Sequence, residues 1–141
     1  MRVPPVVHLA GAALAQRTVG RPPTRGSLLA SAPFVAASGW LAGGAVREFV
    51  RRGTTVDPMT VDRASTLVRT GPNAVTRNPM YLGMAVLLTG HAVARRSPLA
   101  LLPVAGLVAA LDHWQIPAEE AALAQRFEDY AGYVASVPRW L

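Results

Sequence analysis

Residues 69–83 place an arginine, a turn and a helix start next to one another, a combination that suits an anionic ligand. Pro79 fits the first position of a helix, and Asn78 before it is a favourable N-cap. The N-terminus of such a helix presents free N–H groups and the positive end of its dipole. Arg77 adds a guanidinium that binds carboxylates and phosphates through two hydrogen bonds. The segment therefore predicts a binding site for a carboxylate or a phosphate group.

A second polar group, His113, Glu119 and Glu120, follows later in the chain. Acidic residues in the first turn of a helix complement its dipole, which alone would account for the pair of glutamates. Glu120, however, falls near the apolar helix face of Leu123, so its carboxylate should be partly buried and should need a cationic partner. Arg77, His113 or the ammonium group of a ligand could supply that partner.

The composition indicates a membrane protein with one domain, residues 1–141. Apolar residues make up 51% of the chain and charged residues only 16%, whereas soluble domains are about 25% charged. The sequence has no cysteine, which excludes disulfides, thiolate metal sites and cysteine nucleophiles. We predict no metal site.

Four apolar runs predict an all-α, multipass membrane bundle of about four transmembrane helices. Residues 27–46 are uncharged over the length of one bilayer span. Residues 79–94 and 98–113 follow as a helical hairpin with a tight connection. Residues 3–15 are shorter, and they predict either a first membrane helix, which we favour, or the apolar part of a signal peptide.

Residues 117–134 predict a different kind of helix. Leu123, Phe127, Tyr130 and Val134 recur at helical spacing, while charged residues fall between them. This pattern is typical of an amphipathic helix at the membrane surface or against the domain.

Small residues share one face of the predicted helix 27–46, namely Ala32, Ala36, Gly39 and Gly43. Such spacing lets helices approach one another closely. We expect this face to pack within the bundle, and the alternative is a homo-oligomer.

The charge pattern predicts the orientation in the bilayer. The net charge is +6, but the arginines flank apolar runs and aromatic residues do not interleave with them. We therefore exclude nucleic acid as a partner and expect the lipid bilayer instead. With a cytoplasmic N-terminus, one side holds Arg2, Arg47, Arg51, Arg52, Arg63, Arg69, Arg77, Arg126 and Arg139, and the other holds Arg17, Arg21, Arg25, Arg95 and Arg96. This bias predicts that the site lies on the cytoplasmic face. We expect the membrane to be a bacterial cytoplasmic membrane.

The ordered set of motifs resembles the isoprenylcysteine carboxyl methyltransferase-like and phospholipid methyltransferase-like integral membrane enzymes. Residues 77–83 match the family's Arg-(His/Asn)-Pro-x-Tyr-x-Gly motif. The other matching residues are Gly53, Thr54, Gly71, Pro72, His113, Glu119, Glu120, Phe127, Tyr130, Tyr133 and the ending 137–140. The resemblance covers nearly the whole chain and is strongest from about residue 67 to the end.

The resemblance implies transfer of a methyl group from S-adenosylmethionine to a lipophilic or membrane-accessible small acceptor with a carboxylate, thiol or amine. The cofactor-binding part would be about residues 67–141. Its cofactor-binding residues would be Arg77, Asn78, Pro79, Tyr81, Gly83, His113, Glu119 and Glu120. Methyl transfer to a carboxylate or thiolate requires no dedicated base, so no catalytic residue is assigned, and Arg77 and Arg139 are candidates for pairing with an anionic acceptor.

Two alternatives stay open beside the methyltransferase. One is a catalytically silent membrane protein with the same fold, and the other is a steroid-reductase-like enzyme that uses NADPH. The chain also departs from many relatives at Asn73 and Ala74, where an aromatic or basic pair is usual, and at Glu128, where glycine is expected. These departures leave the identity of the acceptor open.

Overall fold

The computed structural model describes residues 3–57 and 59–141, and every regular element within them is helical. Arg2, which entered the arginine count above, lies outside this part. The elements are α1 (Pro5–Val19), α2 (Arg25–Ser38), a π-helical turn (Gly39–Gly43), α3 (Gly44–Arg51), α4 (Pro79–Ala94), α5 (Leu102–Ala110), a π-helical turn (Leu111–Gln115), α6 (Ile116–Arg126) and α7 (Tyr130–Ser136). Short 3-10 turns lie at Val61–Arg63, Gly71–Ala74 and Pro98–Leu101. The predicted all-α architecture is confirmed.

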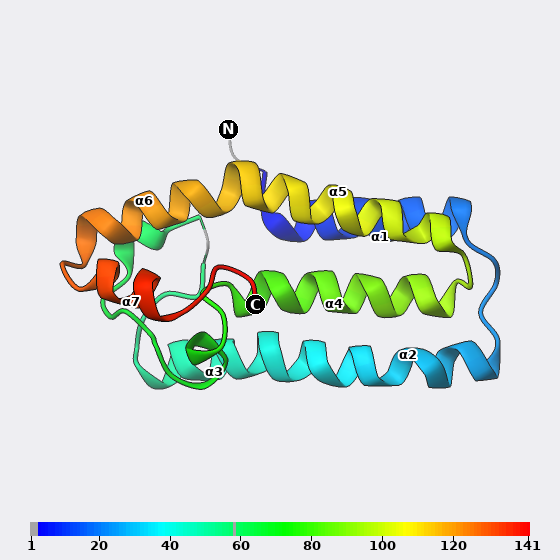
Figure 1. The fold of residues 1–141 in the computed structure, drawn as a ribbon, viewed down its shortest axis with the longest axis horizontal. Coiled ribbons are helices and arrows are strands. Elements are labelled where there is room, and N and C mark those ends of the chain that lie inside the picture. Colours follow the sequence, from blue (N-terminus) through cyan, green and yellow to red (C-terminus); the bar gives the residue numbers. More distant parts are fainter. Residues whose placement is uncertain (1–2, 58) are drawn as a thin grey trace.

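The helices form an antiparallel bundle with two unlike ends (Figure 1). The short connections at residues 20–24 and 95–97 lie at one end. The long connection at residues 52–78 lies at the other end, together with α6, α7 and the C-terminus. The arrangement therefore brings both predicted polar groups to the same end of the molecule.

Two continuous helical segments are long and apolar enough to cross a membrane, Arg25–Arg51 and Pro98–Arg126. At 1.5 Å per residue each spans about 40 Å, which exceeds the hydrocarbon core of a bilayer. Helix α4 is apolar but shorter. The predicted number of four spans is not established by these helices and stays a prediction.

The boundary predicted between a helix at 98–113 and a separate amphipathic helix at 117–134 is wrong. The helix runs without a break to Arg126, and the chain leaves it only at Phe127, whose backbone is extended. Pro117 is tolerated because it falls in the first turn after a π-helical turn, where the regular hydrogen-bond ladder is already interrupted.

Glycines of α4 set its close contact with α2. A Cβ atom at Gly83 would lie 3.1 Å from the Cβ of Ala42, and one at Gly90 would lie 2.6 Å from the Cβ of Phe34. Only glycine allows the two backbones to approach this closely.

The small-residue face of α2 does not pack within the bundle, so that expectation is wrong. Ala32, Ala36, Gly39 and Gly43 are exposed, and a Cβ at either glycine would meet nothing within 4 Å. The glycines of α4 pack against the face of α2 that carries Ser31 and Ser38 instead. The positions of the glycines in α4, rather than the small residues of α2, therefore determine which face of α2 is buried. The homo-oligomer stays a prediction.

A buried glutamine joins α1 to the bundle. The side chain of Gln16 is fully buried, and its amide nitrogen donates to the carbonyl oxygens of Leu88 (2.9 Å) and Ala100 (2.7 Å). Its amide oxygen lies 2.6 Å from Nδ1 of His91. Because an unpaired amide in an apolar interior is costly, these contacts fix α1 against α4 and the start of the last long helix.

The packing of α4 predicts opposite effects for two glycine-to-alanine substitutions. Gly90→Ala should lower the free energy of unfolding by about 1–3 kcal/mol, because the new methyl group collides with Phe34. Gly106→Ala in α5 meets open space and should raise stability by up to about 1 kcal/mol through helix propensity. Thermal unfolding of the detergent-solubilised variants measures both, and a Gly90→Ala protein as stable as the wild type would contradict the packing.

Candidate functional site

A cavity opens at the end of the bundle that holds the long connection, α6 and α7. Its volume is about 100 Å³, which is small for a small-molecule site. The polar lining comes from Thr55, Asp57, Thr66, Asn73, Arg77, Asn78, Tyr81, Glu119, Glu120, Tyr130 and Tyr133. The apolar lining includes Phe49, Val56, Val61, Leu67, Val68 and Leu123. The cavity thus also draws on residues 49–66, which precede the cofactor-binding part predicted at 67–141.

A carboxylate held between two guanidinium groups forms the polar wall. Glu120 Oε1 accepts from Arg77 Nη2 at 2.9 Å, and Glu120 Oε2 accepts from Arg139 Nη2 at 2.6 Å. Arg139 Nη1 also donates to Asp112 Oδ1 at 3.1 Å. The Glu120 side chain is only 20% exposed and that of Arg77 only 10%. The sequence-based expectation that Glu120 is partly buried with a cationic partner is confirmed, with Arg77 and Arg139 as the partners.

The C-terminal chain is tied to the first motif by hydrogen bonds to its backbone. Arg77 donates from its N–H to Pro138 O at 2.9 Å and from Nη1 to Val137 O at 2.6 Å. Thr76 Oγ1 and Asn78 Nδ2 both donate to Arg139 O, at 2.9 and 3.0 Å. Residues 137–141 therefore close over the start of α4.

These bonds change the interpretation of the first motif. Asn78 occupies the N-cap position of α4, but its side chain makes no capping hydrogen bond, because its amide nitrogen bonds the C-terminal chain instead. Both terminal nitrogens of Arg77 are engaged by Glu120 and Val137. The main role of Arg77 is therefore to hold the start of α4 to α6 and to the C-terminal chain.

A second carboxylate lies beside the first. Glu119 Oε1 accepts from the hydroxyl of Tyr81, and it accepts from Gln115 Nε2 at 2.5 Å. The Tyr81 side chain is almost fully buried. This arrangement presents a negative charge and an aromatic ring to the same part of the cavity.

Asn73 contributes a buried amide. Its Nδ2 has no hydrogen-bond partner among the described residues, although buried amide groups are nearly always paired. Its backbone oxygen accepts from the hydroxyl of Tyr133 at 2.6 Å. Burial raises the pKa of Tyr133 to about 12, so this hydroxyl stays a donor at neutral pH.

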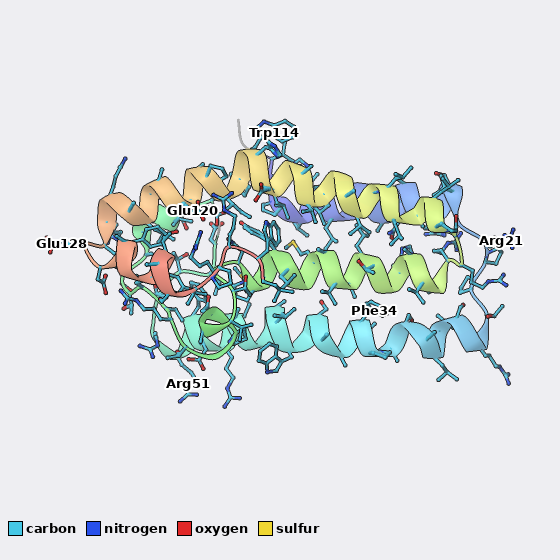
Figure 2. All side chains as sticks on the ribbon, in the orientation of Figure 1. Arg21, Phe34, Arg51, Trp114, Glu120 and Glu128 are labelled. Carbon is cyan, nitrogen blue, oxygen red and sulfur yellow. The ribbon has the colours of Figure 1, made fainter. Side chains whose placement is uncertain are left out.

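The structure brings together most of the residues predicted to bind a cofactor. Those that line the cavity are Arg77, Asn78, Pro79, Tyr81, Glu119 and Glu120. Figure 2 shows Glu120 on the inner side of α6, whereas Glu128 lies at the outer tip. Gly83 is not among the lining residues, because it packs against Ala42 and the carbonyl oxygen of Ser38.

His113 lies outside the cavity, and its neighbour Asp112 is the residue that contacts the Glu120 ion pair, through Arg139. His113 is exposed, with Nδ1 2.8 Å from Ala109 O of its own helix. In a regular α-helix residue 113 would share a face with Glu120, about two turns later. The π-helical turn at Leu111–Gln115 inserts an extra residue into that spacing. Asp112 therefore reaches Arg139.

Sequence reasoning missed Asp112, Gln115 and the buried amide of Asn73 as site residues. The spacing of four between Gln115 and Glu119 is a recognised helical pair and could have indicated the first contact. No pattern in the sequence announces the π-helical turn.

An open apolar groove lies on α5 beside the cavity. Its walls include Leu101, Val104 and Val108, and its polar end is formed by Asp112, His113 and Trp140. The indole Nε1 of Trp140 donates to Asp112 Oδ1 at 3.0 Å. Arg139 bonds both Asp112 and Glu120, so its guanidinium stands between the groove and the cavity.

Comparison with known proteins gives one match. Residues 27–130 match the model of the phospholipid methyltransferase family. No curated protein and no solved structure was similar enough to the chain to count as a match. The matched stretch is more than half of the chain and contains six of the residues predicted to bind a cofactor that line the cavity. The resemblance drawn from the motifs is confirmed, and the chain belongs to the phospholipid methyltransferase family.

Proposed function

We propose that this protein transfers a methyl group from S-adenosylmethionine to a lipophilic acceptor that it reaches from the membrane. The observation that carries the proposal is the cavity in which Glu119, Tyr81 and the unpartnered amide of Asn73 face an apolar wall. Membership of a methyltransferase family supports the reaction type.

The lining suits the chemical groups of S-adenosylmethionine. A carboxylate such as that of Glu119 can bind the ammonium group or the ribose hydroxyls, and the ring of Tyr81 can face the positive sulfonium. The amide of Asn73 can donate to the cofactor's carboxylate or to its adenine. We assign Arg77 to holding Glu120 and the C-terminal chain, because its terminal nitrogens are already engaged.

Bound S-adenosylmethionine supplies an electrophilic methyl carbon on its sulfonium sulfur. The chain's part is to hold that carbon in line with the acceptor and to exclude water. Residues 137–141, tied to Thr76 and Asn78, cover the start of α4 beside the cavity. A carboxylate or thiolate acceptor needs no protein base. Arg139 is not assigned to the acceptor either, because its nitrogens are already engaged by Glu120 and Asp112.

The outer faces of the helices support a place in the bilayer. Leu29 and Leu102 are 74% and 67% exposed, and many other large apolar side chains are exposed along the long helices. Water would disfavour such a surface, whereas lipid tails match it. We place the protein as a multipass protein of a bacterial cytoplasmic membrane, with the cavity on the cytoplasmic face as the arginine count predicts.

The groove on α5 offers a route for the acceptor. An apolar chain could lie along Leu101, Val104 and Val108, with its reactive group at Asp112 and Trp140. From there the Arg139 side chain connects Asp112 to Glu120 in the cavity. This position joins a lipid-facing groove to the cofactor cavity.

The proposal predicts which cofactor the purified protein binds. Isothermal titration of detergent-solubilised protein should detect S-adenosylmethionine and S-adenosylhomocysteine, since both carry the same amino-acid and nucleoside parts. NADPH should produce no binding heat. Binding of NADPH alone would favour the reductase, and binding of none of the three would favour the catalytically silent protein.

Glu119→Gln should weaken S-adenosylmethionine binding by about tenfold or more, because a charged hydrogen bond contributes about 1.5–3 kcal/mol. The amide keeps the shape of the side chain but removes its charge. Glu128→Gln is the matched control, since Glu128 is exposed outside the cavity and its loss should leave the affinity unchanged. Equal affinities for the two variants would refute the role of Glu119.

Glu120→Gln should lower the free energy of unfolding by about 3 kcal/mol, because it leaves two partly buried guanidinium groups without their shared anion. Chemical denaturation of the solubilised protein measures the change, and Glu128→Gln should stay within about 0.5 kcal/mol of the wild type. A Glu120→Gln protein of wild-type stability would show that the ion pairs are dispensable.

A further inference from the structure

The end of the bundle opposite the cavity carries a concentrated positive charge. Arg17, Arg21 and Arg25 come from the first connection and its flanks, and Arg95 and Arg96 come from the other short connection. The chain has eight acidic residues, and none of them falls in residues 1–47 or 63–111. These five arginines, here called the distal arginines, therefore have no carboxylate beside them in either connection.

Arg95 and Arg96 hold the two connections together without losing their charge. Arg95 Nη2 donates to the carbonyl oxygens of Arg17 (3.1 Å) and Gly20 (3.2 Å), and Arg96 Nη2 donates to Pro22 O at 2.9 Å. A Cβ atom at Gly20 would lie 2.6 Å from that of Arg95, so glycine lets the Arg95 side chain cross the linker. Backbone carbonyl groups satisfy these donors but do not neutralise them.

Arg96 adopts a backbone conformation that glycine would favour. Its φ is 51°, in the left-handed region, where an L-residue with a long side chain costs about 1 kcal/mol. Strain of this kind is found where the side chain has a use. An arginine at this position supplies charge at the tip of the turn.

Exposed leucines lie directly next to the distal arginines. Leu28 and Leu29 follow Arg25 in the first turn of α2, and Leu99 and Leu102 follow the second connection. All four side chains are more than half exposed. Arginine head groups above an apolar belt match the interface of a bilayer, where anionic head groups meet lipid tails. Figure 2 shows Arg21 projecting outward at this end.

We propose that the distal arginines bind the head groups of anionic phospholipids in the leaflet opposite the cavity. The belt of exposed leucines favours a lipid over a soluble acidic macromolecule, which would leave those side chains in water. The inference rests on the membrane placement given under the proposed function, but it does not depend on methyl transfer. Under this proposal one end of the bundle binds anionic phospholipids, and the other end binds the cofactor and the acceptor.

The test compares lipid binding in matched double variants. Purified protein in a neutral detergent is titrated with dioleoyl-phosphatidylglycerol or dioleoyl-phosphatidylcholine, and bound lipids are counted by native mass spectrometry. Wild-type protein should prefer the anionic lipid, and added salt should reduce the preference. Arg21→Gln/Arg25→Gln should weaken phosphatidylglycerol binding by roughly tenfold. Arg47→Gln/Arg63→Gln, which removes two exposed arginines near the cavity end, should leave it unchanged.

The variant Arg96→Gly tests whether the charge of Arg96 contributes to lipid binding independently of any effect on protein stability. It relieves the left-handed strain but also removes the bond to Pro22 O, so thermal stability should stay close to that of the wild type, while phosphatidylglycerol binding should fall severalfold. S-adenosylmethionine affinity, measured on the same samples, should be the same in all variants. If the wild type bound no S-adenosylmethionine but still preferred the anionic lipid, the proposed methyl transfer would be contradicted and the lipid assignment would not.

Three results would overturn the lipid assignment. The wild type could bind both lipids equally, or the distal and control double variants could lose phosphatidylglycerol binding equally. Alternatively, the wild type could show no lipid preference but bind an oligonucleotide that Arg21→Gln/Arg25→Gln no longer binds.

Discussion

The carboxylate of Glu120, held between Arg77 and Arg139, is the contact on which the cavity end of this protein depends. It joins three segments that are far apart in the sequence: the start of α4, the middle of α6 and the C-terminal chain. Because Glu120 and Arg77 are largely removed from water, removing either charge leaves the other without its partner. The pair therefore constrains where each of the three segments lies.

Hydrogen bonds around this ion pair give the C-terminal chain a defined course. Thr76, Arg77 and Asn78 bind carbonyl oxygens of residues 137–139, so a motif that resembles a ligand site also acts as an internal clasp. Glu119, Tyr81 and Asn73 also line the cavity, and their polar groups face apolar side chains from the long connection. This separates the residues that shape the cavity from those that can meet a ligand inside it.

Local sequence patterns predicted where the helices lie better than they predicted which side of each helix packs against its neighbours. Apolar runs located the apolar helices but divided the last long one, Pro98–Arg126, into two, and the burial argument for Glu120 anticipated its cationic partner. The errors concern choices made between elements. Because of the π-helical turn, Asp112 and not His113 contacts Arg139. The glycines of α4 pack against the other face of α2. The side-chain amide of Asn78 bonds the C-terminal chain and does not cap α4. The last two outcomes depend on neighbours distant in sequence, which periodicity and capping preferences do not encode.

The central claim is that the cavity delivers a methyl group to a lipophilic acceptor, and methyl incorporation tests it most directly. Membranes that contain the protein are incubated with S-adenosylmethionine tritiated in its methyl group, and label is measured in the chloroform-extractable fraction. Incorporation above that of membranes without the protein is the predicted result. No excess label in any lipid extract, from protein that remains folded and binds S-adenosylmethionine, would contradict the claim.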